Sequence, residues 1–81
     1  MTRNDIEETI KQFLVEELEI DSGKIAPEAK LKDDIGIDSL DFVDIAVIVN
    51  KKFGVKLITS EMTSVITFND FCNYIEQQTT K

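Results

Sequence analysis

The stretch Gly36-Ile37-Asp38-Ser39-Leu40-Asp41 is the part of this sequence from which its fold and function are best interpreted. Gly36 frees the backbone before an apolar helix, and Asp38 is a good N-cap residue. The first turn of that helix offers N–H groups without partners, so a phosphate ester on Ser39 would lie at the positive end of the helix dipole. The chain has no histidine to activate Ser39 as a nucleophile. Seen alone, a serine after aspartate is more often an ordinary helix cap than a modification site, but it can also be a place where another enzyme attaches a group.

The central helix is predicted to begin at Asp38 or Ser39 and to end at Phe53, because Gly54 is a natural C′ residue. The segment is rich in β-branched residues, and a buried strand is the competing interpretation. Its length exceeds that of most strands, and both of its ends carry helix signals. We therefore predict a helix.

As a helix, this segment carries two apolar stripes. Helical spacing predicts a core face made of Phe42, Ile45, Ala46, Val49 and Phe53. The second stripe comprises Leu40, Val43 and Val47, with Asp41 and Asp44 beside it. Exposure of the second stripe would give a partner-binding surface next to Ser39, and the alternative is a helix buried on both sides.

Two further helices are predicted from apolar periodicity. The first begins with a capping box of Asn4 and Glu7 and ends at residues 21–23, and its stripe consists of Ile6, Ile10, Phe13, Leu14 and Leu18. The last begins after Thr67, where Asp70 completes a capping box, and its inner face holds Phe68, Phe71, Cys72 and Ile75.

The connections complete the predicted fold. Residues 23–37 form a long structured loop that Pro27 keeps from being helical, with apolar anchors at Ile25, Ala29, Leu31 and Ile35. After an extended stretch at 55–58, a short helix is expected around Ser60 to Val65, capped by Thr59 or Ser60. The prediction is an all-α fold: a small bundle of three main helices plus a short helix, with a long loop between the first two main helices.

The composition indicates one small domain over residues 1–81. The net charge of −7, concentrated in residues 1–50, argues against nucleic-acid binding and suits docking onto basic partner surfaces. A single cysteine suits a reducing compartment, and no secretory signal is visible. The longest apolar run, residues 45–49, is too short to span a bilayer. We expect a cytoplasmic monomer without membrane insertion.

Self-contained catalysis and metal binding lack the residues that they need. Without histidine there is no Ser-His pair, and Phe42 stands where a Ser-x-x-Lys pattern requires lysine. The acidic run at 33–38 has Ile35 and Ile37 where a calcium loop needs oxygen ligands, and one cysteine offers no zinc ligand set. Cys72 is interpreted as a buried structural thiol. We predict a protein that is not an enzyme and has no metal site.

The motif and its context resemble a known family. The run Leu31-x-Asp33-Asp34-Ile35-Gly36-Ile37-Asp38-Ser39-Leu40-Asp41 is similar to the signature of acyl carrier proteins. The similarity covers nearly the whole chain: 6–18 resembles the first family helix, Phe53-Gly54 the end of the second, and 68–75, with Tyr74-Ile75, the last. Length, charge and helix order agree with this family.

The resemblance implies a function and its residues. A phosphopantetheinyl transferase (holo-carrier synthase) would attach 4′-phosphopantetheine from coenzyme A to Ser39, and the arm's thiol would hold acyl groups as thioesters. A ketosynthase, an acyltransferase and other acyl-processing enzymes of fatty-acid or related lipid or polyketide biosynthesis would then use them. Partners would dock on Asp38, Leu40, Asp41, Val43, Asp44 and Val47. The bundle would shelter the acyl chain between its helices, lined by Ile45, Val49, Leu57 and Phe71.

Two departures from the family keep alternatives open. Asn50-Lys51-Lys52 stands where the family often has an acidic cluster, and residues 59–64 are less acidic than usual. A dedicated carrier of an unusual acyl or hydroxyacyl group is therefore possible, as is an aminoacyl or peptidyl carrier. A hypothesis from another class is an unmodified helical protein-interaction module that binds through Leu40, Val43 and Val47.

Overall fold

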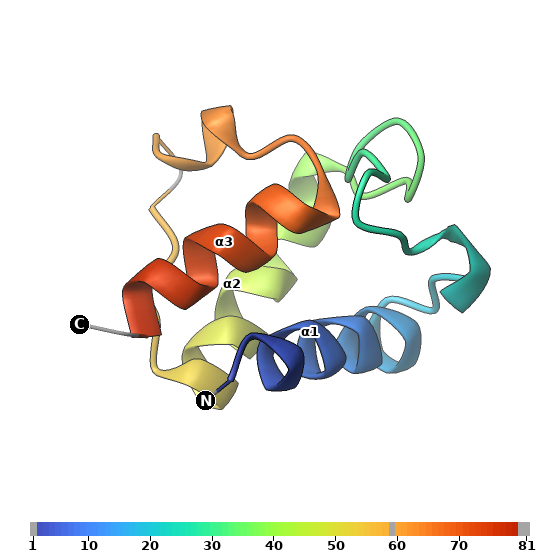
Figure 1. The fold of residues 1–81 in the computed structure, drawn as a ribbon. Coiled ribbons are helices and arrows are strands. Elements are labelled where there is room, and N and C mark those ends of the chain that lie inside the picture. Colours follow the sequence, from blue (N-terminus) through green and yellow to red (C-terminus); the bar gives the residue numbers. More distant parts are fainter. Residues whose placement is uncertain (1, 59, 80–81) are drawn as a thin grey trace.

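The computed structural model describes residues 2–58 and 60–79, apart from the side chains of Ser39 and Thr63. All regular elements in this part of the chain are helical, which confirms the all-α prediction (Figure 1). They are, in order, the helices α1 (Arg3–Glu17), α2 (Ser39–Phe53) and α3 (Phe68–Thr79), and the short 3-10 turns η1 (Ser22–Lys24) and η2 (Met62–Ser64).

The N-terminal cap of α1 differs from the prediction. Thr2, not Asn4, is the N-cap residue: its hydroxyl oxygen accepts the N–H of Asp5 at 3.1 Å, and the Asp5 carboxylate accepts the N–H of Thr2 at 3.2 Å. Glu7, the predicted partner of Asn4, instead accepts a hydrogen bond from the Arg3 guanidinium at 2.8 Å. The helix therefore begins at Arg3, two residues before Asp5, where a cap at Asn4 would have started it.

The C-terminal end of α1 also comes earlier than residues 21–23. The helix ends at Glu17, and Glu19 adopts a left-handed conformation with φ of 56°. The N–H of Ile20 then donates to the carbonyl oxygen of Leu14 at 3.1 Å. The chain turns at a non-glycine residue because this backbone bond and the partly buried Ile20 hold it there.

The long loop is tied to the start of α3 through its backbone. The N–H of Leu31 donates to Ile66, that of Phe68 to Ala29, and that of Asn69 to Pro27, at 2.9 to 3.0 Å. An isolated antiparallel bridge joins Lys30 to Thr67. Figure 1 shows the loop packed at the end of the bundle where α3 begins. The predicted anchors Ile25, Ala29, Leu31 and Ile35 are all buried.

The predicted short helix around Ser60 to Val65 is only the single turn η2. Its N-cap position is Glu61, which makes no side-chain capping bond, and Val65 is already extended. Thr59, one of the two predicted caps, lies outside the described residues. Without a capping bond and with an extended residue directly after the turn, the helix does not propagate.

The core lies where the three helices meet, and α1 and α3 share the most extensive contact between helices of the described chain. Fully buried side chains come from all three helices: Ile6, Ile10, Leu14, Ile45, Val49, Phe71, Cys72 and Ile75. This set confirms the predicted inner faces of α1 and α3 and places Cys72 in the core. Phe42, Ala46 and Phe53, predicted for the core face of α2, are only half-buried.

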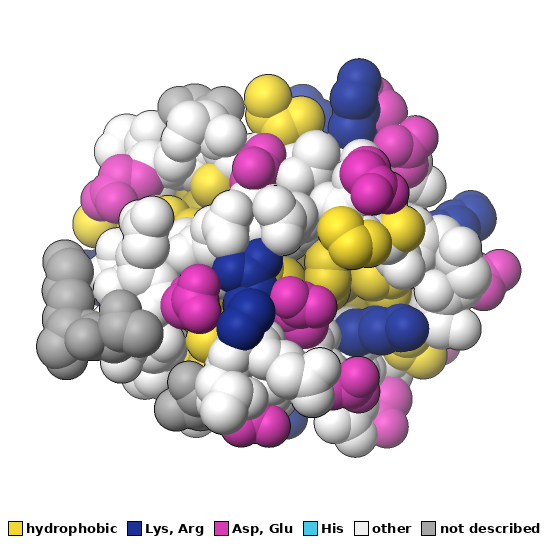
Figure 2. All heavy atoms as spheres, viewed as in Figure 1, with side chains coloured by type: hydrophobic (Ala, Val, Ile, Leu, Met, Phe, Trp, Pro, Cys, Tyr) yellow, Lys and Arg dark blue, Asp and Glu magenta, His cyan; other side chains and the backbone are white. Residues whose placement is uncertain are grey.

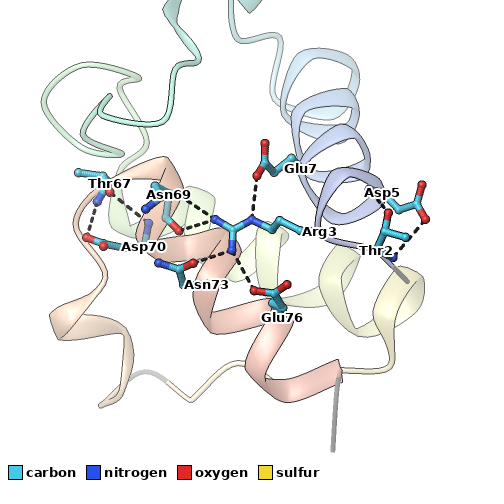
Figure 3. Close-up of polar contacts among 9 residues, drawn as sticks. All are labelled: Thr2, Arg3, Asp5, Glu7, Thr67, Asn69, Asp70, Asn73 and Glu76. Atoms are coloured by element: carbon cyan, nitrogen blue, oxygen red, sulfur yellow. Dashed lines mark hydrogen bonds and ion pairs between the residues drawn. The ribbon is translucent and has the colours of Figure 1, made fainter.

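Arg3 links α1 to α3 at their exposed edge, a contact that no sequence pattern indicated. Its guanidinium donates to Glu7 on its own helix and to Asn69, Asn73 and Glu76 on α3 (Figure 3). Figure 2 shows acidic side chains spread across this face, with a basic group near its middle flanked by acidic ones.

Candidate functional site: the start of α2 and the groove beside it

Ser39 is the first residue of α2, and its backbone is held from both sides. Before it, Gly36 turns the chain with φ of 89°, and the N–H of buried Ile37 donates to the carbonyl oxygen of Leu31 at 2.8 Å. After it, Asp38 caps the helix, which confirms that prediction. The motif therefore positions Ser39 through buried and hydrogen-bonded neighbours, although the Ser39 side chain lies outside the described part of the structure.

The capping geometry corrects one expectation about this helix start. The Asp38 carboxylate accepts the N–H groups of Leu40 and Asp41 at 2.9 and 3.0 Å, and the Asp38 carbonyl accepts that of Phe42. These three N–H groups are therefore not available to a phosphate on Ser39. The helix dipole remains, but the amides of Leu40 and Asp41 are already satisfied by the Asp38 side chain.

The second stripe of α2 is exposed. Leu40 is 77% exposed, Val43 64% and Val47 55%. The alternative of a helix buried on both sides is therefore wrong. Asp44 is exposed beside this stripe, whereas Asp38 and Asp41 form the reciprocal capping box, in which Asp41 accepts the N–H of Asp38 at 3.2 Å. Two of the three predicted docking carboxylates thus also stabilise the helix start.

A cavity of about 790 Å³ lies between α2, the loop and the segment around η2. Its wall is largely apolar and is made of Leu31, Phe42, Val43, Ala46, Val47, Leu57, Met62, Val65 and Ile66, with Lys30, Lys32 and Asp33 at the loop. Of the four side chains expected to line an acyl-chain pocket, Leu57 is in this wall. Ile45, Val49 and Phe71 are fully buried in the core behind it. The half-buried Phe42 and Ala46, assigned to the core by their spacing, line the cavity instead.

Cys72 is confirmed as a structural thiol. Its side chain is fully buried on α3, and desolvation raises its pKa to about 12. A thiol needs to ionise to act as a nucleophile, so Cys72 stays unreactive at neutral pH. Among residues 2–58 and 60–79, no group of three or more His, Cys, Asp or Glu residues could hold a metal ion.

Comparison with known proteins identifies the class to which this site belongs. Residues 8–75 match the family model of the phosphopantetheine attachment site, so the chain is a domain that carries 4′-phosphopantetheine as its cofactor. The sequence is also 36% identical over 77 residues to the acyl carrier protein of Thermotoga maritima, and the alignment covers 95% of each chain. The chain belongs to the acyl carrier protein family.

Membership in this family makes the chain a carrier that works with a phosphopantetheinyl transferase and with acyl-processing enzymes. The structure is compatible with the cofactor, because Asp38 and Leu40, on either side of Ser39, are both exposed. When bound, the cofactor supplies a thiol that holds acyl groups as thioesters. No helix in the described ranges has the length and apolar character needed to cross a membrane.

Proposed function

We propose that Ser39 is the attachment residue and that the protein shuttles acyl intermediates between enzymes of fatty-acid or related lipid or polyketide biosynthesis in the cytoplasm. The observation that carries this proposal is the fixed position of the Ser39 backbone at the capped start of α2, between two exposed neighbours. Attachment forms a phosphoester between the Ser39 hydroxyl oxygen and the phosphopantetheine phosphorus of coenzyme A. Adenosine 3′,5′-bisphosphate leaves, and the hydroxyl proton is released.

The proposed docking surface is the exposed face of α2 next to Ser39. Leu40, Val43 and Val47 would form its apolar centre, and Asp38, Asp41 and Asp44 would attract basic residues of the partner. Three large apolar side chains more than half exposed on one helix face are more than the scattered singles of an ordinary surface. Their position beside Ser39 would bring an enzyme to the arm.

The proposed acyl shelter is the cavity beside α2, with Leu57 in its wall. Ile45, Val49 and Phe71 would line it only after the helices part, because they are fully buried. We expect longer acyl chains to raise the melting temperature of the acylated protein, since they bury more apolar surface. Melting temperatures that do not depend on chain length would count against this shelter.

The experiment that tests attachment is the intact mass of the purified protein before and after incubation with coenzyme A and a broad-specificity phosphopantetheinyl transferase. We expect the wild type and Ser22→Ala, which changes an exposed serine in η1, each to gain one phosphopantetheine. Ser39→Ala should gain none. A folded, initially unmodified wild-type protein that gains no mass would favour the unmodified interaction module.

A dedicated pathway is the second candidate, and one observation favours it. The last turn of α2 carries Lys51 and Lys52, both exposed, on the helix that partners would approach. A housekeeping ketosynthase with basic residues placed for an acidic carrier surface would be repelled by these two lysines. Release of the loaded acyl or aminoacyl group, followed by mass spectrometry, would separate an acyl from an aminoacyl or peptidyl carrier.

A further inference from the structure

A groove runs along α2 from the cavity beside Phe42 toward the end of the helix. The cavity of about 790 Å³ adjoins a more open one of about 480 Å³, and Ala46, Val47 and Leu57 line both. The second cavity is completed by Asn50, Lys51 and Lys56. Because the two cavities share three lining side chains, a single elongated ligand can occupy both.

The chemistry of the groove changes along its length. The α2 wall of the part nearest Ser39 is apolar and includes Phe42 and Val43, while Lys30, Lys32 and Asp33 stand on the loop side. The far end carries the ammonium groups of Lys51 and Lys56 and the amide of Asn50, all on exposed residues. An alkyl end placed there would gain little, whereas a carboxylate could accept hydrogen bonds from both ammonium groups and neutralise part of their charge.

The length of the groove sets the size of the ligand. At about 1.5 Å of rise per residue, α2 advances about 13 Å from Phe42 to Lys51. An extended alkyl chain with bonds of about 1.5 Å covers that distance with about ten carbons. An acyl group of this length whose thioester carbon lies beside Phe42 would place its far end at Lys51 and Lys56.

From these observations we infer that the cargo of this carrier is a medium-length acyl group with a carboxylate at its far end, bound between Lys51 and Lys56. The inference rests on the proposed attachment of the cofactor to Ser39. The other charged residues lining the groove are Lys30, Lys32 and Asp33, at its loop end. The test must therefore distinguish the two pairs of lysines.

The probe is a decanedioyl group, 13C-labelled at its free carboxyl and loaded onto the protein from its coenzyme A thioester by a phosphopantetheinyl transferase. NMR titration should show a carboxyl pKa about half a unit or more below that of the free coenzyme A thioester, because two cations favour the ionised form. Lys51→Met with Lys56→Met should abolish this shift. Lys11→Met with Lys24→Met is the matched control, with the same change in net charge at exposed positions that line neither cavity, and should retain the shift.

Three outcomes overturn the inference. The first is a cargo carboxyl whose pKa is not shifted on the loaded wild-type protein. In that case Lys51 and Lys56 would instead bind an acidic side chain of a partner enzyme. The second is a shift that survives Lys51→Met with Lys56→Met. The third is a shift that requires Lys30 and Lys32 instead. Failure of the proposed function is seen separately, as the absence of any mass gain at Ser39 before the titration begins.

Discussion

Replacing Asp38 tests whether the carboxylate beside Ser39 stabilises the helix or serves only in docking. Asp38→Ala removes the acceptor for the N–H groups of Leu40 and Asp41, at 2.9 and 3.0 Å, whereas the backbone N–H of residue 38 can still donate to the Asp41 carboxylate. Loss of an N-cap side chain costs about 1 kcal/mol, within a range of about 0.5–2 kcal/mol. In a chain of 81 residues, 1 kcal/mol lowers the melting temperature by about 4–8 °C.

Asp38→Asn separates the two roles, because asparagine caps helices about as well as aspartate but carries no charge. We expect thermal unfolding, followed by circular dichroism, to show at most a few tenths of a kcal/mol lost in Asp38→Asn. Asp44→Ala, at an exposed position within α2, is the control that removes a carboxylate without touching the cap, and it should change stability little. If Asp38→Asn and Asp38→Ala lose the same stability, the capping bonds are not the source of the loss and the argument is refuted.

Four further outcomes follow from other contacts. Arg3→Met should lose about 1 kcal/mol of stability in urea unfolding, because the hydrogen bonds from Arg3 to α3 disappear, and an unchanged midpoint would contradict this. Tyr74→Phe should be neutral or stabilising by up to about 1 kcal/mol, since the buried Tyr74 hydroxyl has no partner among the described residues; clear destabilisation would show a missed bond. Hydrogen bonds from the N–H groups of Thr67 and Ile66 lower the pKa of Asp70. The contribution of Asp70 to stability is therefore present above its unfolded pKa of about 4 and is lost as the pH falls through its folded pKa. In unfolding measured from pH 5 to 2, Asp70→Asn should lose less stability with falling pH than the wild type does. Lys51→Glu with Lys52→Glu should strengthen docking to a housekeeping ketosynthase, and unchanged steady-state kinetics of that enzyme with the holo-protein would remove the argument for a dedicated partner set.

The helices could be predicted because their signals are local. Ile6, Ile10, Phe13 and Leu14 form a periodic stripe, and all four are buried. Asp38 and Gly54 bracket α2 as predicted, and the left-handed Gly54, with φ of 69°, donates its N–H to Asn50 at 2.9 Å. The cap signals predicted the helix correctly despite the β-branched composition of this segment. The low intrinsic helix propensity of Ile45 and Val49 is outweighed by the burial of their side chains in the core.

What could not be predicted depends on contacts between distant residues. Thr2 rather than Asn4 caps α1, and Arg3, the residue directly after the cap, binds Glu76 on the distant helix α3. The cavity likewise requires the loop and the η2 segment to meet α2, so helical spacing alone placed Phe42 and Ala46 in the core. The apolar pattern of α2 predicts that other segments pack against this helix. It does not predict which of its apolar side chains those segments leave half-buried.

The ties between the loop and the start of α3 affect how freely this protein can change. They use N–H and C=O groups, which nearly every residue type possesses, so they do not depend on which side chains the loop carries. Proline is the exception at positions 31, 68 and 69, because each donates an N–H. Lys30 and Lys32 are exposed on this backbone frame. Selection can therefore exchange the charges at one end of the proposed cargo groove without moving the start of α2, and on this proposal cargo specificity can evolve separately from attachment at Ser39.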